Sequence, residues 1–327
     1  MSASQFTIYS STDSGAPILN GTTGSLLNVF DLCLVSGFGS QLGAGWTKPI
    51  ANSGFRGCYR NTSGTSLTLM VIDNGSFPTV TTGSACGWEI LTSLTGNIGS
   101  GTNQFPLPTQ QLTTGIVPIS KSITSDATPR YWRMYADAYT FYFFSMIDVP
   151  TPPGNYLSFW FGDIFSLAGS ADTFRCMING GTANTSASNL WDKLSFALNN
   201  GPPAPAGLWA ARPWTTVGGS VAMQRLGDMA LTQAATNPLV ATGIVNVPNL
   251  PDQSAIFSPI RVSDNPYNSI RGRMRGLYHV CHPSSSFYDG QILQGTNEYI
   301  NKTFQIIKQG PAGGILAIEI SATVETN

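Results

Sequence analysis

Charge is what this sequence has least of. Only 10 % of its 327 residues are Asp, Glu, Lys or Arg, whereas soluble globular domains usually have about 25 %. The net charge is −1, so repulsion between copies is weak and association is favoured. We therefore interpret most of the surface as covered by neighbouring molecules. The alternative is a solvent face of Ser, Thr, Asn and Gln, as in many extracellular β proteins.

Long apolar segments are also missing. The first nine residues hold neither a basic region nor an apolar run, so we expect no secretory signal there. The longest apolar candidate, Tyr139 to Val149, is shorter than the roughly 18 residues that cross a bilayer, and it contains Ser145 and Asp148. We expect a protein that is made in a cytosol and does not span a membrane.

The sequence has few residues that could form disulfides or bind a metal. The five cysteines are scattered, odd in number and without CxxC spacing, so we expect buried free thiols and no disulfide. They are Cys33, Cys58, Cys86, Cys176 and Cys281. The only histidines, His279 and His282, flank Cys281. In a strand His282 points away from the other two, so three ligands converge only if the chain turns, which Pro283 allows. We expect strand-end packing and no bound metal.

Motifs for catalysis and cofactor binding are missing too. No G-x-S-x-G elbow, Walker loop or dinucleotide fingerprint occurs. The scattered acids fall mostly where turns are expected, which is their ordinary position. They are Asp73, Asp137, Asp148, Asp163, Asp172 and Asp289. A glycosidase pair among them would leave no spacing signature. The sequence nevertheless predicts no catalytic residue, no cofactor and no enzyme.

Short apolar runs between Gly and Pro are what the sequence does contain. The 35 Gly and 21 Pro separate runs rich in β-branched and aromatic residues, and several of these runs alternate with polar residues. The segments Tyr131 to Tyr135 and Tyr139 to Met146 predict a hairpin with a short loop at the centre of the core. Ser269 to Val280 predicts a long strand. We expect a mainly β fold of antiparallel sandwich or barrel-like sheets, with one or two short helices.

One main helix is expected from Thr23 to Ser36. Thr23 or Ser25 can cap its start, and Gly37 supplies a left-handed position at its end. The residues of its apolar face are Leu26, Phe30, Cys33 and Leu34. Asn189 to Leu198 is a second, weaker helical candidate.

Two stretches give tentative domain boundaries. The Ser/Thr/Gly-rich span Thr92 to Thr114 is long for a loop inside a compact domain, and we interpret it as an arm or an exposed excursion. The Pro-rich stretch Gly201 to Gly207 indicates a stiff connector or an exposed loop. The boundaries give a β-rich domain with one helix at 1–115, an aromatic hairpin core region at 116–200 and a β-rich region at 201–327. A single compact unit is the alternative.

The densest charge cluster is the alternating set Arg271, Arg273 and Arg275. In a strand these side chains share one face, and they repel one another unless acids or phosphates lie opposite. Gly272 and Gly276 let another backbone come close. We predict contacts with carboxylates of a neighbouring subunit rather than an internal salt-bridge network. Intramolecular pairing or solvation is the alternative. Nucleic acid is the weaker choice, because the chain has no basic surplus.

Several motifs together resemble a family of uncharacterised tailed-bacteriophage proteins encoded among virion-assembly genes. The motifs span nearly the whole chain and carry no chemistry individually. They are Tyr9-Ser-Ser-Thr-Asp-Ser-Gly-Ala-Pro17, Gly45-Trp-Thr-Lys-Pro49, Phe55-Arg-Gly-Cys-Tyr-Arg60, Tyr139-Thr-Phe-Tyr142, Phe161-Gly-Asp-Ile164, Arg275-Gly-Leu-Tyr-His-Val-Cys-His-Pro283, Lys302-Thr-Phe-Gln-Ile-Ile-Lys308 and Glu319-Ile-Ser-Ala-Thr-Val-Glu-Thr-Asn327.

The resemblance implies a structural component of a virion, such as a capsid decoration or head–tail protein, made in the host bacterial cytoplasm. Its partners would be other virion proteins and copies of itself. A tail or head appendage that binds host-surface glycan is the alternative, because exposed aromatic rings can stack on sugars. The candidate rings are Trp46, Trp88, Trp160, Trp191, Trp209 and Trp214.

Overall fold

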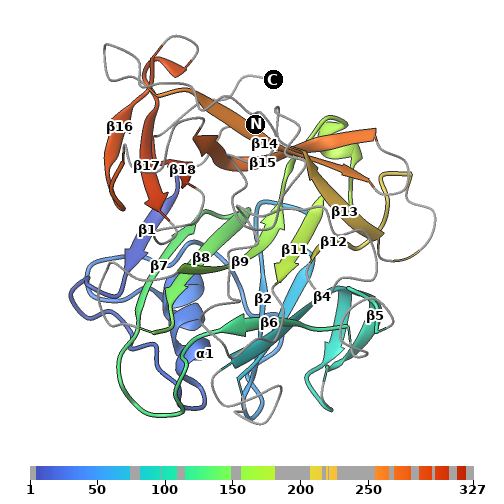
Figure 1. Ribbon diagram of the computed structural model, residues 1–327. Helices are drawn as coiled ribbons and strands as arrows, with labels where there is room; N and C mark the ends of the chain where they lie inside the picture. Colours follow the sequence, from blue (N-terminus) through green and yellow to red (C-terminus); the bar gives the residue numbers. More distant parts are fainter. Residues whose placement is uncertain are drawn as a thin grey trace.

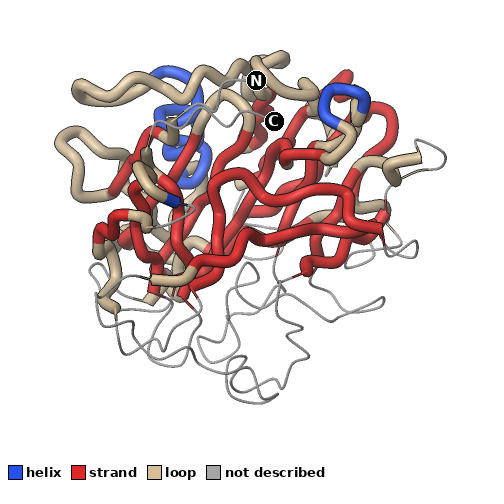
Figure 2. The backbone as a smooth tube through the Cα atoms, turned by 90° about the horizontal axis from the view of Figure 1, so that it is seen from above, coloured by secondary structure: helices blue, strands red, loops and turns tan. Residues whose placement is uncertain are grey.

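The computed structural model describes residues 5–73, 82–96, 98–108, 115–148, 156–180, 207–215, 219, 221–226, 255–264, 269–280, 287–296, 299–308 and 315–321. Strands take up 49 % of these residues and helices 8 %, which confirms the predicted mainly β fold (Figures 1 and 2). None of the helices in these ranges has the length and apolar composition needed to cross a membrane.

The smaller of the two sheets has five antiparallel strands in the order β2-β3-β4-β5, with β6 beside β4. The strands are β2 Arg56–Arg60, β3 Thr68–Ile72, β4 Thr82–Ser93, β5 Ser100–Phe105 and β6 Val117–Ser120. Strand β5 lies inside the span 92–114, and its Gln104 is paired with Trp88 of β4. That part of the span is therefore a paired strand, and the interpretation as an arm is wrong for it.

The larger sheet has thirteen antiparallel strands in the order β1-β7-β8-β9-β11-β12-β13-β14-β15-β18-β17-β16, with β10 beside β15. The strands are β1 Thr7–Ser10, β7 Tyr131–Ala136, β8 Thr140–Met146, β9 Tyr156–Asp163, β10 Phe165–Ser166, β11 Cys176–Gly180, β12 Gly207–Ala210, β13 Val221–Leu226, β14 Phe257–Asp264, β15 Ser269–Val280, β16 Ile292–Gln294, β17 Thr303–Lys308 and β18 Ile315–Glu319.

The larger sheet folds back on itself, which gives three layers in all. In Figure 1 the smaller sheet lies below, strands β7 to β12 form the middle layer, and strands β14 to β18 lie above. Contacts between the two halves of the larger sheet connect the middle layer to the upper layer. Tyr135 Oη donates to Gln305 Oε1 at 2.7 Å, and Gln5 Nε2 donates to the carbonyl oxygen of Ile320 at 3.1 Å.

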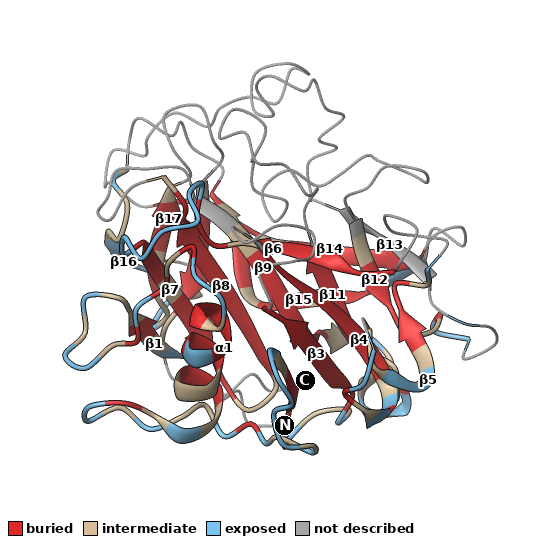
Figure 3. Cartoon of the chain, turned by 90° about the horizontal axis from the view of Figure 1, so that it is seen from below, coloured by how far each residue is buried: buried red, intermediate tan, exposed pale blue. Residues whose placement is uncertain are grey.

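The middle layer is buried on both faces. Phe141 and Phe143 of β8 point into the core shared with the smaller sheet, whereas Tyr142 and Phe144 point into the core between the halves of the larger sheet. All seven residues of β8 are consequently buried (Figure 3). The hairpin of β7 and β8 is confirmed, with Ala136 paired to Phe141 across its turn.

The predicted helix is present but begins later than expected. It is an α-helix, α1 Ser25–Phe30, continued by a π-helical turn, η1 Asp31–Ser36. Neither predicted side chain caps it: Gly24 holds the N-cap position with φ +83°, and the Leu26 N–H donates to Asp73 Oδ2 at 2.9 Å. The turn ends at Gly37, but its ψ of 172° is not left-handed helical. The candidate 189–198 lies outside the described residues.

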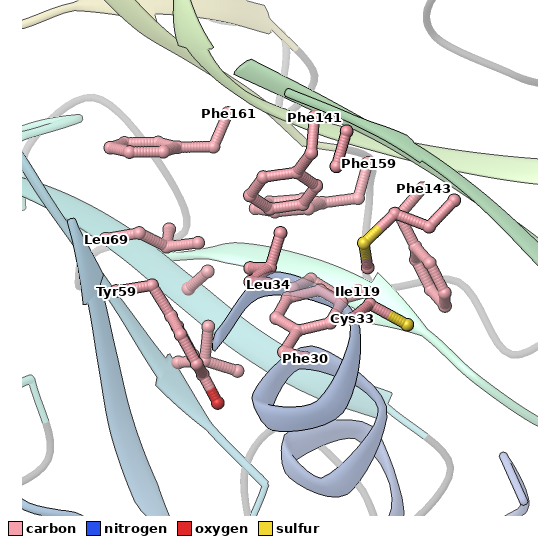
Figure 4. Packing of buried hydrophobic residues seen from close by; sticks show 14 of the residues in the cluster. Phe30, Cys33, Leu34, Tyr59, Leu69, Ile119, Phe141, Phe143, Phe159 and Phe161 are labelled. Atoms are coloured by element: carbon pink, nitrogen blue, oxygen red, sulfur yellow. The ribbon is translucent and has the colours of Figure 1, made fainter. Parts of the chain in front are cut away.

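One aromatic side chain fixes α1 against the middle layer. The Phe30 ring lies 5.3 Å from the ring of Phe141 and 5.4 Å from that of Phe143, in edge-to-face contacts (Figure 4). Its third edge-to-face contact, at 5.8 Å, is with Tyr59 of the smaller sheet. Such pairs stabilise a core beyond the area that they bury. A short 3-10 turn, η2 Gly169–Ala171, lies between β10 and β11.

Strand pairing crosses both tentative boundaries. Strand β6, after residue 115, pairs with β4, and strand β12, after residue 200, pairs with β11. Residues 201–206 of the Pro-rich stretch lie outside the described residues, and Gly207 begins β12. The three proposed regions therefore share their sheets.

Candidate functional site

Strand β15 carries the three arginines, and its backbone is irregular. Met274 and Leu277 point into the same core, although residues three apart in a regular strand face opposite sides. Between them lies Gly276, whose φ of +56° suits glycine. The pairing with β14 also shifts between Pro259 and Arg261. Bulges of this kind re-aim side chains and are common beside functional sites.

Arg271 is buried within a cluster of acceptors, and only 1 % of its side chain is exposed. Its Nε and Nη2 donate to the two carboxylate oxygens of Asp172, each at 2.8 Å. Nη1 donates to Asp264 Oδ1 at 3.3 Å and to the carbonyl oxygen of Arg212 at 2.8 Å. Nη2 also donates to the carbonyl oxygen of Phe174 at 2.7 Å. Acceptors of the same chain thus surround this guanidinium.

Arg275 lies between two aromatic rings. Its Cζ is 4.3 Å from the centroid of Tyr139 and 4.3 Å from that of Phe165, which is a favourable cation–π geometry. Nη2 donates to Asp137 Oδ2 at 3.1 Å. The turn between β7 and β8 holds Asp137, because its Oδ1 accepts from the N–H groups of Tyr139 and Thr140. Nε of Arg275 is buried and has no hydrogen-bond partner among the described residues.

Arg271 and Arg275 therefore belong to an internal salt-bridge network, and the prediction that they avoid one is wrong. The physical reason is that acids of the same chain lie beside both guanidinium groups and balance their charge, although Nε of Arg275 keeps no acceptor among the described residues. Arg273 differs from them. It is half-buried and lies 5.4 Å from the ring of Phe165. A contact of Arg273 with a neighbouring subunit stays a prediction.

Asp163, at the end of β9, ties the smaller sheet to the middle layer. Its Oδ1 accepts from Thr65 Oγ1 at 2.7 Å and from Asn61 Nδ2 at 3.1 Å, and both donors lie in the connection between β2 and β3. Its Oδ2 accepts from the Thr65 N–H at 2.9 Å and lies 3.1 Å from Arg175 Nε. Burial raises the pKa of Asp163, and these donors and the charge of Arg175 offset that rise only in part.

At Asp172 the interactions that lower the pKa are stronger than the burial that raises it. Burial raises its pKa, but the hydrogen bonds and the charge of Arg271 outweigh burial, and the net pKa is lowered. Ser166 Oγ and the N–H of Phe174 donate to the same carboxylate, at 2.8 Å and 3.2 Å. Asp172 is thus a permanently charged partner for Arg271 near neutral pH.

A small cavity opens beside Arg275. Its volume is about 20 Å³, and it is lined by Tyr139, Asp163, Ile164, Phe165, Ser166, Gly169, Arg175 and Arg275. One water molecule needs roughly 10–15 Å³ by the same measure, so the space is limited to a few atoms. Two arginines, Arg175 and Arg275, and one acid, Asp163, are the charged residues of its lining.

Five of the six candidate acids lie in turns or loops outside the strands, as expected, and only Asp163 lies in a strand. Asp137 does lie in a turn, but Asp73, Asp137, Asp163 and Asp172 are all buried. Arg271 and Asp172 are 99 residues apart and Arg275 and Asp137 are 138 apart, so no local spacing connects them. Asp73 and Asp137 directly follow β3 and β7, but Asp163 ends β9 and Asp172 precedes β11, so no common position along the chain marks these acids.

The expectations for cysteine and metal are tested only in part. The described cysteines are free and buried, and they are Cys33, Cys58, Cys86 and Cys176. Burial raises the pKa of Cys86 to about 12, so its thiol stays protonated. In the part of the chain that the structure describes, no three His, Cys, Asp or Glu side chains are grouped as metal ligands. Residues 281 and 282 lie outside it, so the absence of a metal beside His279 stays a prediction.

The proposed tryptophan platform for sugars is not present as such. Four of the six candidate rings are buried, namely Trp46, Trp88, Trp160 and Trp209. Trp214 is half exposed, and Trp191 lies outside the described residues. The large aromatic side chains were needed for the cores on both faces of the middle layer.

No protein-family model matches the sequence, and no curated protein matches it either. The functional interpretation therefore rests on the burial, the charge pairing and the surface of the chain itself.

Proposed function

We propose that this chain is a non-enzymatic structural component of a bacteriophage virion, a capsid decoration or head–tail assembly protein that acts through subunit–subunit contacts. The sequence resemblance supports the virion setting, and the mainly β fold is compatible with it. Its partners are other virion proteins and copies of itself. The observation that carries the proposal is that most of the few charged side chains pair with one another inside the chain.

Most of those charges are paired inside the chain. At least nine of the sixteen Lys and Arg side chains, and ten of the seventeen Asp and Glu side chains, form internal salt bridges. The basic members are Lys48, Lys121, Arg130, Arg133, Arg175, Arg212, Arg271, Arg275 and Lys302. Few charges remain to keep copies apart, and a nearly neutral surface favours association.

Three exposed apolar residues lie next to Arg271 in the sequence or bond to its network through their backbone, and we call them the apolar rim. They are Leu167, Trp214 and Ile270, with 77 %, 50 % and 45 % of their surface exposed. The Leu167 N–H donates to the carbonyl oxygen of Arg271 at 2.8 Å, and the Trp214 N–H donates to Asp264 Oδ2 at 2.6 Å. Buried ion pairs thus hold the backbone of the rim, which supports its use as a preformed apolar contact.

The first test is the composition of purified virions of the phage that encodes the chain. The proposal expects the protein in a fixed copy number after stringent purification, measured by quantitative mass spectrometry. Absence of the protein from infectious particles would contradict the virion role.

A second test addresses the contact itself. The triple variant Leu167→Ser, Trp214→Ser, Ile270→Thr should keep its melting temperature within a few degrees, because these side chains are exposed, but enter particles poorly. Leu42→Ser is the matched control, since Leu42 is 83 % exposed and lies in the loop after η1. Equal incorporation of both variants would show that the rim makes no assembly contact.

A further inference from the structure

We propose that the cavity beside Arg275 is a binding site for a carboxylate, which accepts a hydrogen bond from Nε of this arginine. The carboxylate belongs either to a small organic acid or to an Asp or Glu side chain of a neighbouring protein. The chemistry that the cavity recognises is the same in both cases. The site does not depend on the proposed virion role.

A buried donor without a partner is the first observation. Arg275 Nη2 donates to Asp137, but Arg275 Nε is buried and meets no acceptor among the described residues. Roughly 90 % or more of buried polar groups in proteins have a partner, and a charged group left unsatisfied carries the full cost of its desolvation. An acceptor from outside the chain removes that cost.

The shape of the cavity selects a flat, small acceptor. The rings of Tyr139 and Phe165 lie on either side of the guanidinium of Arg275, so an acceptor reaches Nε only near the guanidinium plane. Carboxylates are planar and match the edge of a guanidinium. The volume of about 20 Å³ admits little more than the two oxygens of a carboxylate. A sugar ring or a nucleotide base does not fit.

The charges that line the cavity favour an anion. Arg175 and Arg275 line it together with one acid, Asp163, so the lining residues carry one positive charge in excess. Asp163 lines it too, but both of its oxygens are engaged, by Thr65, Asn61 and Arg175. Its negative charge is therefore compensated by groups other than Arg275, and Nε stays available.

The direct test follows the Nε–H resonance of Arg275 in ¹⁵N–¹H spectra of the full chain, identified by its absence from the Arg275→Lys variant. Acetate replaces chloride at constant ionic strength. We expect a saturable shift of this resonance with acetate. A resonance that does not move, or that moves equally with bromide, shows that the cavity holds water or any anion, and overturns the proposal.

A second variant keeps the test decisive if Arg275→Lys fails to fold. Gly169→Asn should place a side chain at the edge of the cavity and obstruct entry without altering Arg275, because Gly169 lines the cavity, a Cβ there faces open space and Asn tolerates its φ of +56°. Gly96→Asn is the matched control, with φ +73° and equally open space. Acetate should raise the melting temperature of the wild type and of Gly96→Asn, and leave Gly169→Asn unchanged. Equal responses of all three overturn the site.

Particle incorporation separates the two sources of the carboxylate. If Gly169→Asn loses acetate binding and also enters particles less well than Gly96→Asn, the carboxylate comes from a neighbouring protein. If it loses acetate binding but assembles normally, the ligand is a free small acid. Acetate binding is measured on the isolated chain, so this site and the virion role fail by different measurements.

Discussion

The region around Asp163 and the region around Asp172 both bury a carboxylate beside an arginine, and each carboxylate has four donors. Asp163 has three neutral hydrogen bonds and one nitrogen of Arg175. Asp172 has two neutral hydrogen bonds and two nitrogens of Arg271. At Asp163 the effect of burial on the pKa is larger than that of the donors, so the pKa is raised. At Asp172 the effect of Arg271 and the other donors is larger than that of burial, so the pKa is lowered. The number of polar partners is the same, so the difference in pKa follows from the deeper burial of Asp163 and from the charge and geometry of the partners.

This difference indicates two structural roles. A bidentate, charge-assisted pair keeps Asp172 ionised, and so fixes one charged partner for Arg271. Neutral donors orient Asp163 between the smaller sheet and the middle layer without fully stabilising its charge. The stability of the region around Asp172 therefore depends on an ion pair. The stability of the region around Asp163 depends mainly on the geometry of its hydrogen bonds.

The largest effect is expected from Arg271→Gln. The change leaves Asp172 and Asp264 buried without their main partner, and breaking a buried pair in this way costs about 3–5 kcal/mol. Urea unfolding of the isolated chain measures the change. A cost near 1 kcal/mol would mean that water reaches the two acids. The region around Asp172 would then not depend on an ion pair more than the region around Asp163 does.

A smaller difference is expected between Asp172→Asn and Asp163→Asn. Removing the charge of Asp172 loses hydrogen bonds to a charged group, at about 2–3 kcal/mol, and Asp264 still pairs with Arg271. Removing the charge of Asp163 should cost about 1 kcal/mol, because relief from burying that charge offsets the lost hydrogen bonds. Free energies of unfolding of the two variants, measured side by side, give the order. The reverse order would show that Arg175 matters more than Arg271.

The pH dependence sharpens the same comparison. The pKa of Asp172 is lower in the folded chain, so its stabilisation is present above the unfolded pKa near 3.8 and is lost as pH falls through the folded pKa. The pKa of Asp163 is higher in the folded chain, so its contribution is present below 3.8 and is lost as pH rises through the folded pKa. In unfolding experiments from about pH 3 to pH 6, Asp172→Asn should flatten the acid loss of stability and Asp163→Asn should steepen it. Parallel profiles for both variants and the wild type would contradict both assignments.

The smallest effect is expected from Arg273→Gln, which serves as the control for Arg271→Gln. Arg273 is half-buried and lies over Phe165, and such a cation–π contact contributes about 0.5–1 kcal/mol. Thermal unfolding of the two variants under one condition makes the comparison. A loss as large as that of Arg271→Gln would place Arg273 in the buried network as well.

The sequence predicted those parts of the fold whose causes are local. The predicted strand 269–280 has the observed bounds of β15, because its period of two, with Arg271, Arg273 and Arg275 at alternate positions, lies within the segment itself. The β7–β8 hairpin was predictable from its aromatic runs and the short loop at Asp137. The start of α1 was not, because its backbone is capped by Asp73, 47 residues further along the chain.

The site was predictable only as a set of arginines. Their spacing marked a charged face of a strand, but the partner acids come from the turn after β7 and from the segment after η2. Strand order brings these segments together, and strand order is not encoded in the local pattern. The aromatic residues show the same limit, since the continuous run Phe159-Trp160-Phe161 is typical of a strand buried on both faces but does not indicate which strands cover it.

The closure of the larger sheet has a consequence for the time that folding takes. The contact of Gln5 with Ile320 joins residues 315 positions apart, and that of Tyr135 with Gln305 joins residues 170 apart. Folds dominated by such distant contacts form slowly. At about 5–20 residues per second, a ribosome needs roughly ten seconds or more to pass from β8 to β18. Throughout that interval the face of the middle layer that carries Tyr142 is uncovered, so the nascent chain should be a substrate for chaperones until its last strands emerge.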